Sequence, residues 1–197
     1  MNHPYANLPI RQIKKAFRKI RYTLAPSRYT PKVFCIGYNK TGTTTLGRAL
    51  QTLGYKHSSF NRDIYNHYKL KQFEKIVAYT AKFDSFDDLP WLKEDMIPLL
   101  DQNFPNSKFI YLTRDEKSWK RSFYNWRYKV FGVHPDVEIA WQEYTTHEKF
   151  IQSHFKNRPE TDFLTLEIQD PKGFSKLAEF LGKHAPRDDF PVWNQSQ

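Results

Sequence analysis

Cysteine is the scarcest reactive residue here, with a single copy, Cys35, among 197 residues. One thiol excludes an internal disulfide, and the apolar run around it predicts a buried side chain. Long hydrophobic runs are also missing, because no stretch reaches the roughly 18 apolar residues of a transmembrane helix, and the N-terminus lacks the apolar segment of a signal peptide. The seven histidines show no spacing typical of metal ligands. We therefore expect a soluble, cytoplasmic protein without a bound metal.

Acidic residues are absent from the first 32 positions, which carry eight Lys or Arg. The rest of the chain holds 23 basic and 21 acidic residues, so the net charge of +10 belongs mainly to this N-terminal arm. A nearly neutral body argues against nucleic acid as a partner.

Apolar residues recur at helical spacing in the arm, with basic residues between them: Ile10, Ile13, Phe17, Ile20 and Leu24. This spacing predicts an amphipathic helix, and we assign residues 1–31 to that helix and a linker. The basic helix is a candidate peripheral membrane contact. Packing of its apolar stripe on its own domain is the alternative.

Residues 32–197 alternate between short apolar runs and amphipathic segments, which predicts a single α/β domain. Because parallel strands need crossovers of this length, we expect a three-layer sandwich with a central parallel sheet of about four to five strands. The expected strands are 32–37, 81–83, 107–113 and 163–168, with a polar turn around His57. The expected helices are 43–53, 62–79, 91–102, 116–130, 136–155 and 172–181.

Polar or glycine residues stand where three of the predicted strands end: Gly37, Asp84 and Arg114. Ligands of parallel α/β sheets bind outside the carboxyl ends of the strands. We therefore expect these three positions to lie at one edge of the sheet and to surround a binding site.

The segment Lys40-Thr41-Gly42-Thr43-Thr44-Thr45 lies between the first predicted strand and its helix. Backbone N–H groups of such a loop and the N-terminus of the helix converge on an anion, as in P-loop proteins. A nucleotide triphosphatase would need Gly-Lys-[Ser/Thr], but here the lysine precedes the glycine by two positions. The sequence thus predicts a P-loop NTPase-like fold with a different phosphate ligand.

Lys-Thr-Gly-Thr-Thr resembles the 5′-phosphosulfate loop of the sulfotransferases that use 3′-phosphoadenosine 5′-phosphosulfate. In that family an arginine at the end of a later strand and a serine eight residues on bind the 3′-phosphate, and Arg114 and Ser122 match both. Ser118, on nearly the same helix face, is a rival for the serine. Looser similarities cover residues 84–91, 144–147, 180–182 and 190–194.

The resemblance implies an enzyme that transfers a sulfuryl group from this donor to a hydroxyl acceptor, which is a carbohydrate, a lipid or a small molecule. It also implies donor binding without metal by these residues: Lys40, Thr41, Gly42, Thr43, Thr44, Thr45, Arg114 and Ser122. Two alternatives stay open, a small-molecule kinase on the same scaffold and a non-catalytic nucleotide-binding protein.

Two catalytic roles follow from the resemblance. Lys40 is placed to neutralise the charge that develops on the departing phosphate. The base that accepts the hydroxyl proton has three candidates, Asp88, Asp84 and His57. Asp88 precedes Leu-Pro, where related enzymes carry a catalytic histidine in His-Leu-Pro; an acid before Pro90 is alternatively a helix-capping residue.

Overall fold

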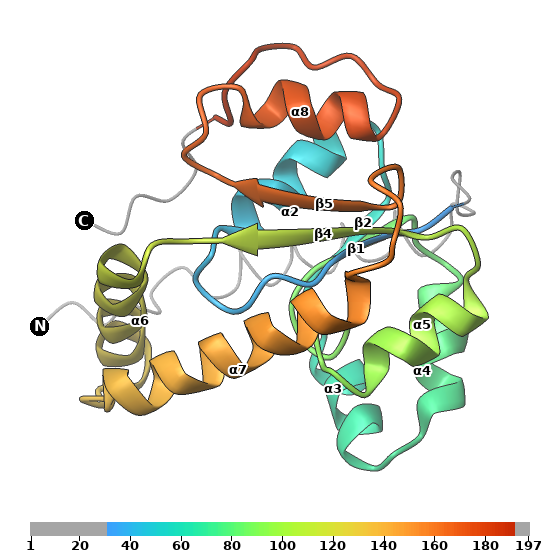
Figure 1. Cartoon of the computed structure of the whole chain (residues 1–197). Coiled ribbons are helices and arrows are strands. Elements are labelled where there is room, and N and C mark those ends of the chain that lie inside the picture. Colours follow the sequence, from blue (N-terminus) through green and yellow to red (C-terminus); the bar gives the residue numbers. More distant parts are fainter. Residues whose placement is uncertain (1–30, 192–197) are drawn as a thin grey trace, which may run out of the picture.

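A computed structural model describes residues 31–191, so the predicted basic helix and all of its linker but residue 31 lie outside the described residues (Figure 1). The strands are β1 (Val33–Cys35), β2 (His57–Ser58), β3 (Ser85–Phe86), β4 (Lys108–Thr113) and β5 (Phe163–Glu167). They form one five-stranded sheet in the order β2-β3-β1-β4-β5. Every pair is parallel, which confirms the predicted fold class.

Helices cover both faces of the sheet (Figure 1). One face packs against α2 (Thr43–Thr52) and α8 (Gly173–Phe180). The other packs against α3 (Arg62–Lys69), α4 (Phe73–Thr80), α5 (Met96–Asn103) and α7 (Val137–Phe155). A further helix, α6 (Glu116–Phe131), follows β4 and packs on α7 beyond the sheet. Within the described residues, no helix combines the length and the hydropathy needed to span a bilayer.

The central strands are apolar on both sides because both of their faces are buried. Along β1 and the residue after it, Val33 and Cys35 contact the α2–α8 layer, whereas Phe34 and Ile36 contact the opposite layer. This alternation follows from the period of two in a strand. Continuous apolar runs therefore identified β1 and β4 from the sequence.

The edge strands and the helices next to them differ from the sequence prediction. His57 lies in strand β2 rather than in a turn, and β3 begins at Ser85, four residues after the expected start. The side chains of these two residues bond across the strand pair, His57 Nδ1 to Ser85 Oγ at 2.9 Å. A polar segment is buried here because its polar groups satisfy one another.

The helix expected at 62–79 is divided into α3 and α4. Lys71 between them adopts a left-handed backbone with φ of 55°. The N–H of Gln72 donates to the carbonyl of His67, which closes the end of α3 in the way that helix C-termini commonly close. The helix expected from residue 91 begins at Met96 instead, after a tight turn that follows Pro90.

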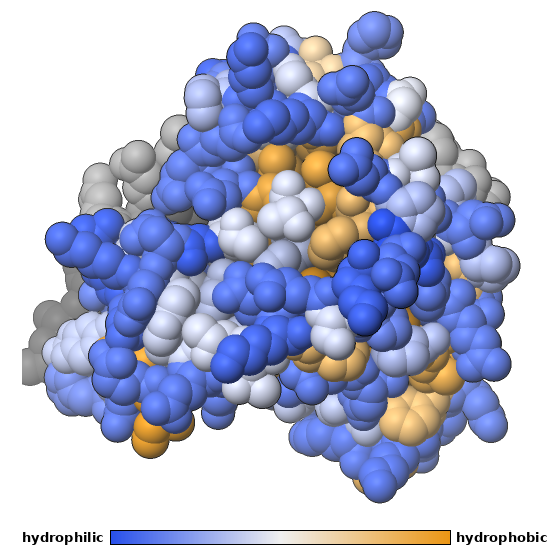
Figure 2. All heavy atoms as spheres, viewed as in Figure 1, coloured by the Kyte–Doolittle hydropathy of each residue, from blue (hydrophilic) through white to orange (hydrophobic). Residues whose placement is uncertain are grey.

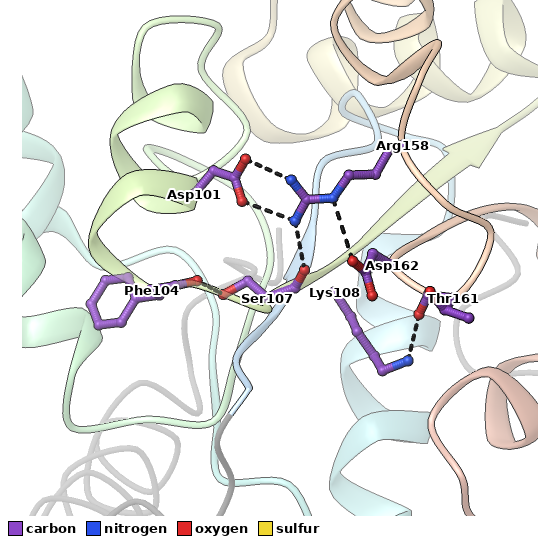
Figure 3. Close-up of polar contacts among 7 residues, drawn as sticks. All are labelled: Asp101, Phe104, Ser107, Lys108, Arg158, Thr161 and Asp162. Atoms are coloured by element: carbon purple, nitrogen blue, oxygen red, sulfur yellow. Dashed lines mark hydrogen bonds and ion pairs between the residues drawn. The ribbon is translucent and has the colours of Figure 1, made fainter.

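The amino edge of the sheet is fastened by Arg158, which follows α7 (Figure 3). Its guanidinium donates to both oxygens of Asp101 at 2.7 and 2.9 Å and to the carbonyl of Ser107 at 3.2 Å. Lys108, in turn, donates to the carbonyl of Thr161 at 2.5 Å. A guanidinium that donates two hydrogen bonds to one carboxylate fixes the relative orientation of the two side chains and also pairs their charges. This edge therefore carries structural contacts, and the opposite, carboxyl edge is available for a site.

Candidate functional site

The loop after β1 forms a tight turn at the centre of the carboxyl edge. The buried Thr41 hydroxyl donates to the carbonyl of Tyr38 at 2.7 Å, and Lys40 and Gly42 both have left-handed backbones, with φ of 69° and 110°. A Cβ at Gly42 would lie 2.3 Å from the side chain of Ile168. Only glycine meets both conditions, the dihedral angle and the close approach of the chain after β5.

The loop leads directly into the N-terminus of α2. Gly42 occupies the N-cap and, having no side chain, provides no capping oxygen, and the first turn holds no acidic residue. The first N–H groups of the helix and the hydroxyls of Thr43, Thr44 and Thr45 therefore lie at a positive helix end that is not neutralised locally. This arrangement is suited to a phosphate or sulfate group.

Arg114, the residue after β4, is bound to this loop. Its Nη1 donates to the carbonyl of Lys40 at 2.8 Å, and its Nε donates to the Ser118 hydroxyl at 2.9 Å. Partial burial has the largest effect on the pKa of Arg114 and lowers it. The negative charge of Asp115 acts in the opposite direction. The strand order explains this proximity, since β4 is the immediate neighbour of β1. The predicted proximity of Arg114 to the loop is thus observed.

The serine that contacts Arg114 is Ser118, in the first turn of α6. Its N–H donates to Asp115, which caps the helix, and its hydroxyl also contacts the Asp115 carboxylate. Ser122, which the resemblance favours for the phosphate, lies one turn further along α6 and is buried. Ser118 therefore holds the guanidinium of Arg114. The phosphate-binding role of Ser122 stays a prediction.

Lys40 lies on the same side of the loop as these groups, and its side chain is half-buried. Its ammonium lies 5.5 Å from the centre of the Trp126 ring, a residue of α6. Burial lowers the pKa of Lys40, and the nearby positive charge of Arg114 lowers it further, whereas Asp88 raises it. The ammonium is thus placed among two charged partners of opposite sign.

Asp88 follows β3, the other neighbour of β1, so it flanks the loop on the side opposite Arg114. Its backbone is left-handed, with φ of 66°, and its Oδ1 accepts a hydrogen bond from the N–H of Leu89 at 2.7 Å. Burial raises the pKa of Asp88 to about 6, with a further contribution from Asp87, although the Leu89 bond and Lys40 lower it. Such a carboxylate is ionised at neutral pH yet more basic than an exposed one.

His57 lies behind the loop, between the sheet and α2. Besides its bond to Ser85, its Nε2 lies 3.4 Å from Oδ1 of Asp87, and both side chains are buried. A Cβ at Gly47 of α2 would lie 2.5 Å from the ring, so the helix closes over the histidine. His57 therefore contacts Asp87, the residue before Asp88, and it is enclosed rather than open to a substrate.

The expected position of Asp84 is wrong. Asp84 precedes β3, so it lies at the amino edge of the sheet, whereas the loop after β1 lies at the carboxyl edge. Its Oδ2 accepts a hydrogen bond from the N–H of Lys56 at 2.8 Å, and its backbone carbonyl accepts from Val33. The start of the strand was placed four residues too early, and this shift moved the aspartate to the wrong end. Asp84 is a structural residue at the start of the strand.

Three side chains from α6 and α7 form hydrogen bonds to the loop, to the end of β1 before it and to Arg114. The sequence analysis did not predict these contacts. Trp119 Nε1 donates to the carbonyl of Asn39 at 2.7 Å, and His147 Nε2 donates to the carbonyl of Ile36 at 2.7 Å. The Tyr144 hydroxyl accepts from the N–H of Arg114 at 3.3 Å. Burial lowers the pKa of His147, which favours a neutral ring. A polar atom on an otherwise apolar helix face is the sequence signal that could have identified these three residues.

A cavity of about 450 Å³ opens beside the site, at the carboxyl ends of β4 and β5. It is lined by Thr113, Thr165, Leu166, Glu167, Gln169, Asp170 and Pro171. Figure 2 shows a hydrophobic hollow at the level of β5, with hydrophilic residues around it. Among residues 31–191, no cluster of His, Cys, Asp and Glu has the arrangement of a metal site.

The family model described as "Sulfotransferase domain" matches residues 32–141 and 128–197, which together span everything after the N-terminal arm. A search of curated proteins finds no match to the sequence.

Proposed function

The chain belongs to the sulfotransferase domain family, and from this premise we propose that it transfers a sulfuryl group from 3′-phosphoadenosine 5′-phosphosulfate to a hydroxyl acceptor. One observation carries the proposal: Lys40 is flanked by Arg114 on one side and Asp88 on the other, around a loop that opens on a helix N-terminus. This arrangement offers separate anion-binding groups and a basic carboxylate at one edge of the sheet.

The residues fit the donor as follows. The phosphosulfate end carries negative charge that matches the N–H groups of the first turn of α2 and the hydroxyls of residues 43–45. Arg114, held by Ser118 and by the loop carbonyl, supplies a second cationic group for the 3′-phosphate, with Ser122 as its proposed companion. A nucleotide without a 3′-phosphate has no need of the second group. These donors bind the nucleotide without requiring a metal.

In the proposed reaction, the acceptor oxygen attacks sulfur while the bond between sulfur and the bridging oxygen breaks. The bridging oxygen leaves on the phosphate, and Lys40 stabilises the negative charge that develops there. The acceptor proton passes to the carboxylate of Asp88, whose raised pKa suits it for this transfer. His57 contacts Asp87, the residue before Asp88, and both side chains are buried.

The proposal is tested by incubating the full chain with the radiolabelled donor and a panel of phenols, sugars and glycolipids, in the presence of EDTA. We expect the label to appear on a hydroxyl compound, together with release of 3′-phosphoadenosine 5′-phosphate. Phosphorylation of an acceptor from ATP and Mg²⁺ would instead support a kinase. Tight binding of the donor without turnover on any acceptor class would support a non-catalytic binding protein.

A further inference from the structure

Exposed apolar side chains concentrate at one place on the molecule, the connection between α6 and α7. Within the described part of the chain, eight large hydrophobic residues are exposed, and six of them lie between residues 124 and 139. They are Tyr124, Tyr128, Val130, Phe131, Val133 and Ile139. We call residues 124–139 the α6–α7 corner. Soluble surfaces rarely gather apolar residues in this way unless they bind a partner.

The corner projects from the body of the protein. In Figure 1 it lies at the lower left, where the two long helices meet beyond the ends of the strands, and in Figure 2 hydrophobic residues reach the surface there. Gly132 ends α6 with a left-handed backbone, and Asp136 caps the start of α7. Val130, Phe131 and Ile139 are 51%, 54% and 58% exposed. A projecting apolar tip is suited to insertion into a membrane surface and not to enclosing a ligand.

Basic residues predominate along α6 after its first residue, Glu116. Residues 117–135 include five Lys or Arg and no Asp or Glu. Arg127 lies over the ring of Phe131, with its guanidinium carbon 4.9 Å from the ring centre. The nearest acids are engaged: Asp136 accepts from two N–H groups of α7, and Glu138 pairs with Lys120 at 2.6 Å. The corner therefore presents exposed apolar side chains next to the basic residues of α6.

We propose that the α6–α7 corner docks on an anionic phospholipid bilayer. Val130, Phe131 and Ile139 enter the interface between headgroups and acyl chains, while Arg127 and Lys129 contact the anionic headgroups. Tyr124 and Tyr128 stack with ring centres 6.4 Å apart. Their amphipathic rings prefer the interface between the headgroups and the acyl chains. A nucleic acid would match the basic charge but offers no environment for the exposed aliphatic side chains.

Docking at this corner would place the phosphate loop close to the membrane. Trp126 contacts Phe131 at the corner, with ring centres 5.6 Å apart, and the same ring lies 5.5 Å from the ammonium of Lys40. The proposal rests on the exposed residues and not on the reaction. It stands even if the transferred group differs from the one proposed above.

A site-specific fluorophore tests insertion directly, because the only natural thiol, Cys35, is buried. Val130→Cys and, as a control, Leu70→Cys are labelled with an environment-sensitive dye; Leu70 is 67% exposed and lies at the α3–α4 turn. With vesicles of phosphatidylcholine and phosphatidylserine, we expect a blue shift and brighter emission at position 130 and little change at position 70. An unchanged signal at position 130 overturns the proposal.

Sedimentation with the same vesicles supplies a second readout on the unlabelled full chain. We expect Arg127→Glu with Lys129→Glu to weaken the partition coefficient by about tenfold or more, and Phe131→Ser to weaken it as well. The matched controls are Lys69→Glu with Lys71→Glu and Leu70→Ser, and circular dichroism verifies that each variant is folded. Equal sedimentation of corner and control variants, or equal binding to pure phosphatidylcholine, contradicts an anionic docking surface at this corner.

Discussion

At the scale of single residues, the proposed reaction divides its work between Lys40 and Asp88. Lys40 acts on the leaving group, so its loss affects every acceptor in a similar way. Asp88 acts on the acceptor, so its importance depends on how readily the acceptor gives up its proton. Each residue shifts the pKa of the other, Asp88 raising that of Lys40 and Lys40 lowering that of Asp88.

A series of phenols with different pKa values separates the two roles. For Asp88→Asn we expect a loss of kcat of about 100-fold or more with a weakly acidic hydroxyl and a partial recovery with an acidic phenol. Lys40→Ala should show no such recovery. The kcat of the wild type should fall as the pH drops below about 6, where Asp88 becomes protonated. Wild-type rates for Asp88→Asn on every acceptor would contradict the role of Asp88 and would mean that the reaction needs no side-chain base.

The raised pKa of Asp88 also predicts a cost in stability. Because the folded state holds this pKa at about 6, above the 3.8 of an ordinary aspartate, ionised Asp88 destabilises the fold above pH 6. The cost disappears below about pH 4, where the group is protonated in both states. Asp88→Asn should therefore raise the free energy of unfolding at pH 8 by about 1–3 kcal/mol. Urea titrations at pH 8 and pH 4 check this; a gain that is equal at both pH values would contradict it.

At the scale of elements, the sequence predicted the central strands better than the edges. β1, β4 and β5 were placed to within about two residues, because buried apolar runs are a strong signal. β2 was missed and β3 was misplaced because each has two residues, and both include buried polar side chains that only a cross-strand partner explains. The error at β3 moved Asp84 to the wrong edge, whereas Arg114 lies beside the loop at the carboxyl edge, as expected.

The loop depends on glycine at position 42, and a matched pair of substitutions measures why. Gly42→Ala faces both an unfavourable φ of 110° and a Cβ 2.3 Å from Ile168. Gly182→Ala has a positive φ of 63° but meets nothing within 4 Å among the described residues. We expect Gly182→Ala to cost about 1 kcal/mol, and Gly42→Ala to cost more and to weaken nucleotide binding. Thermal unfolding and nucleotide titration of both variants test this. Equal effects would mean that contact with Ile168 is unimportant.

At the scale of the whole molecule, the two edges of the sheet have different tasks. The amino edge is closed by Arg158 and its partners (Figure 3). Asp84, at the start of β3, lies at the same edge. At the carboxyl edge lie the loop after β1, Arg114 after β4 and Asp88 after β3, which follow three adjacent strands. The order of those strands was not readable from the sequence, since it is set by crossovers between distant segments. That order brings the two charged residues to opposite sides of one loop.

Calorimetric titration with 3′-phosphoadenosine 5′-phosphate in EDTA tests the central claim, that this edge binds a 3′-phosphorylated nucleotide. We expect the wild type to prefer it over ADP, and Arg114→Ala to lose about 10- to 100-fold of that preference, because a charge-assisted hydrogen bond contributes about 1.5–3 kcal/mol. Arg187→Ala is the control, since this arginine follows α8 and, within residues 31–191, forms its ion pair with the nearby Asp189. Equal affinity of the wild type for ADP, or stronger binding of ATP with Mg²⁺, would contradict the account.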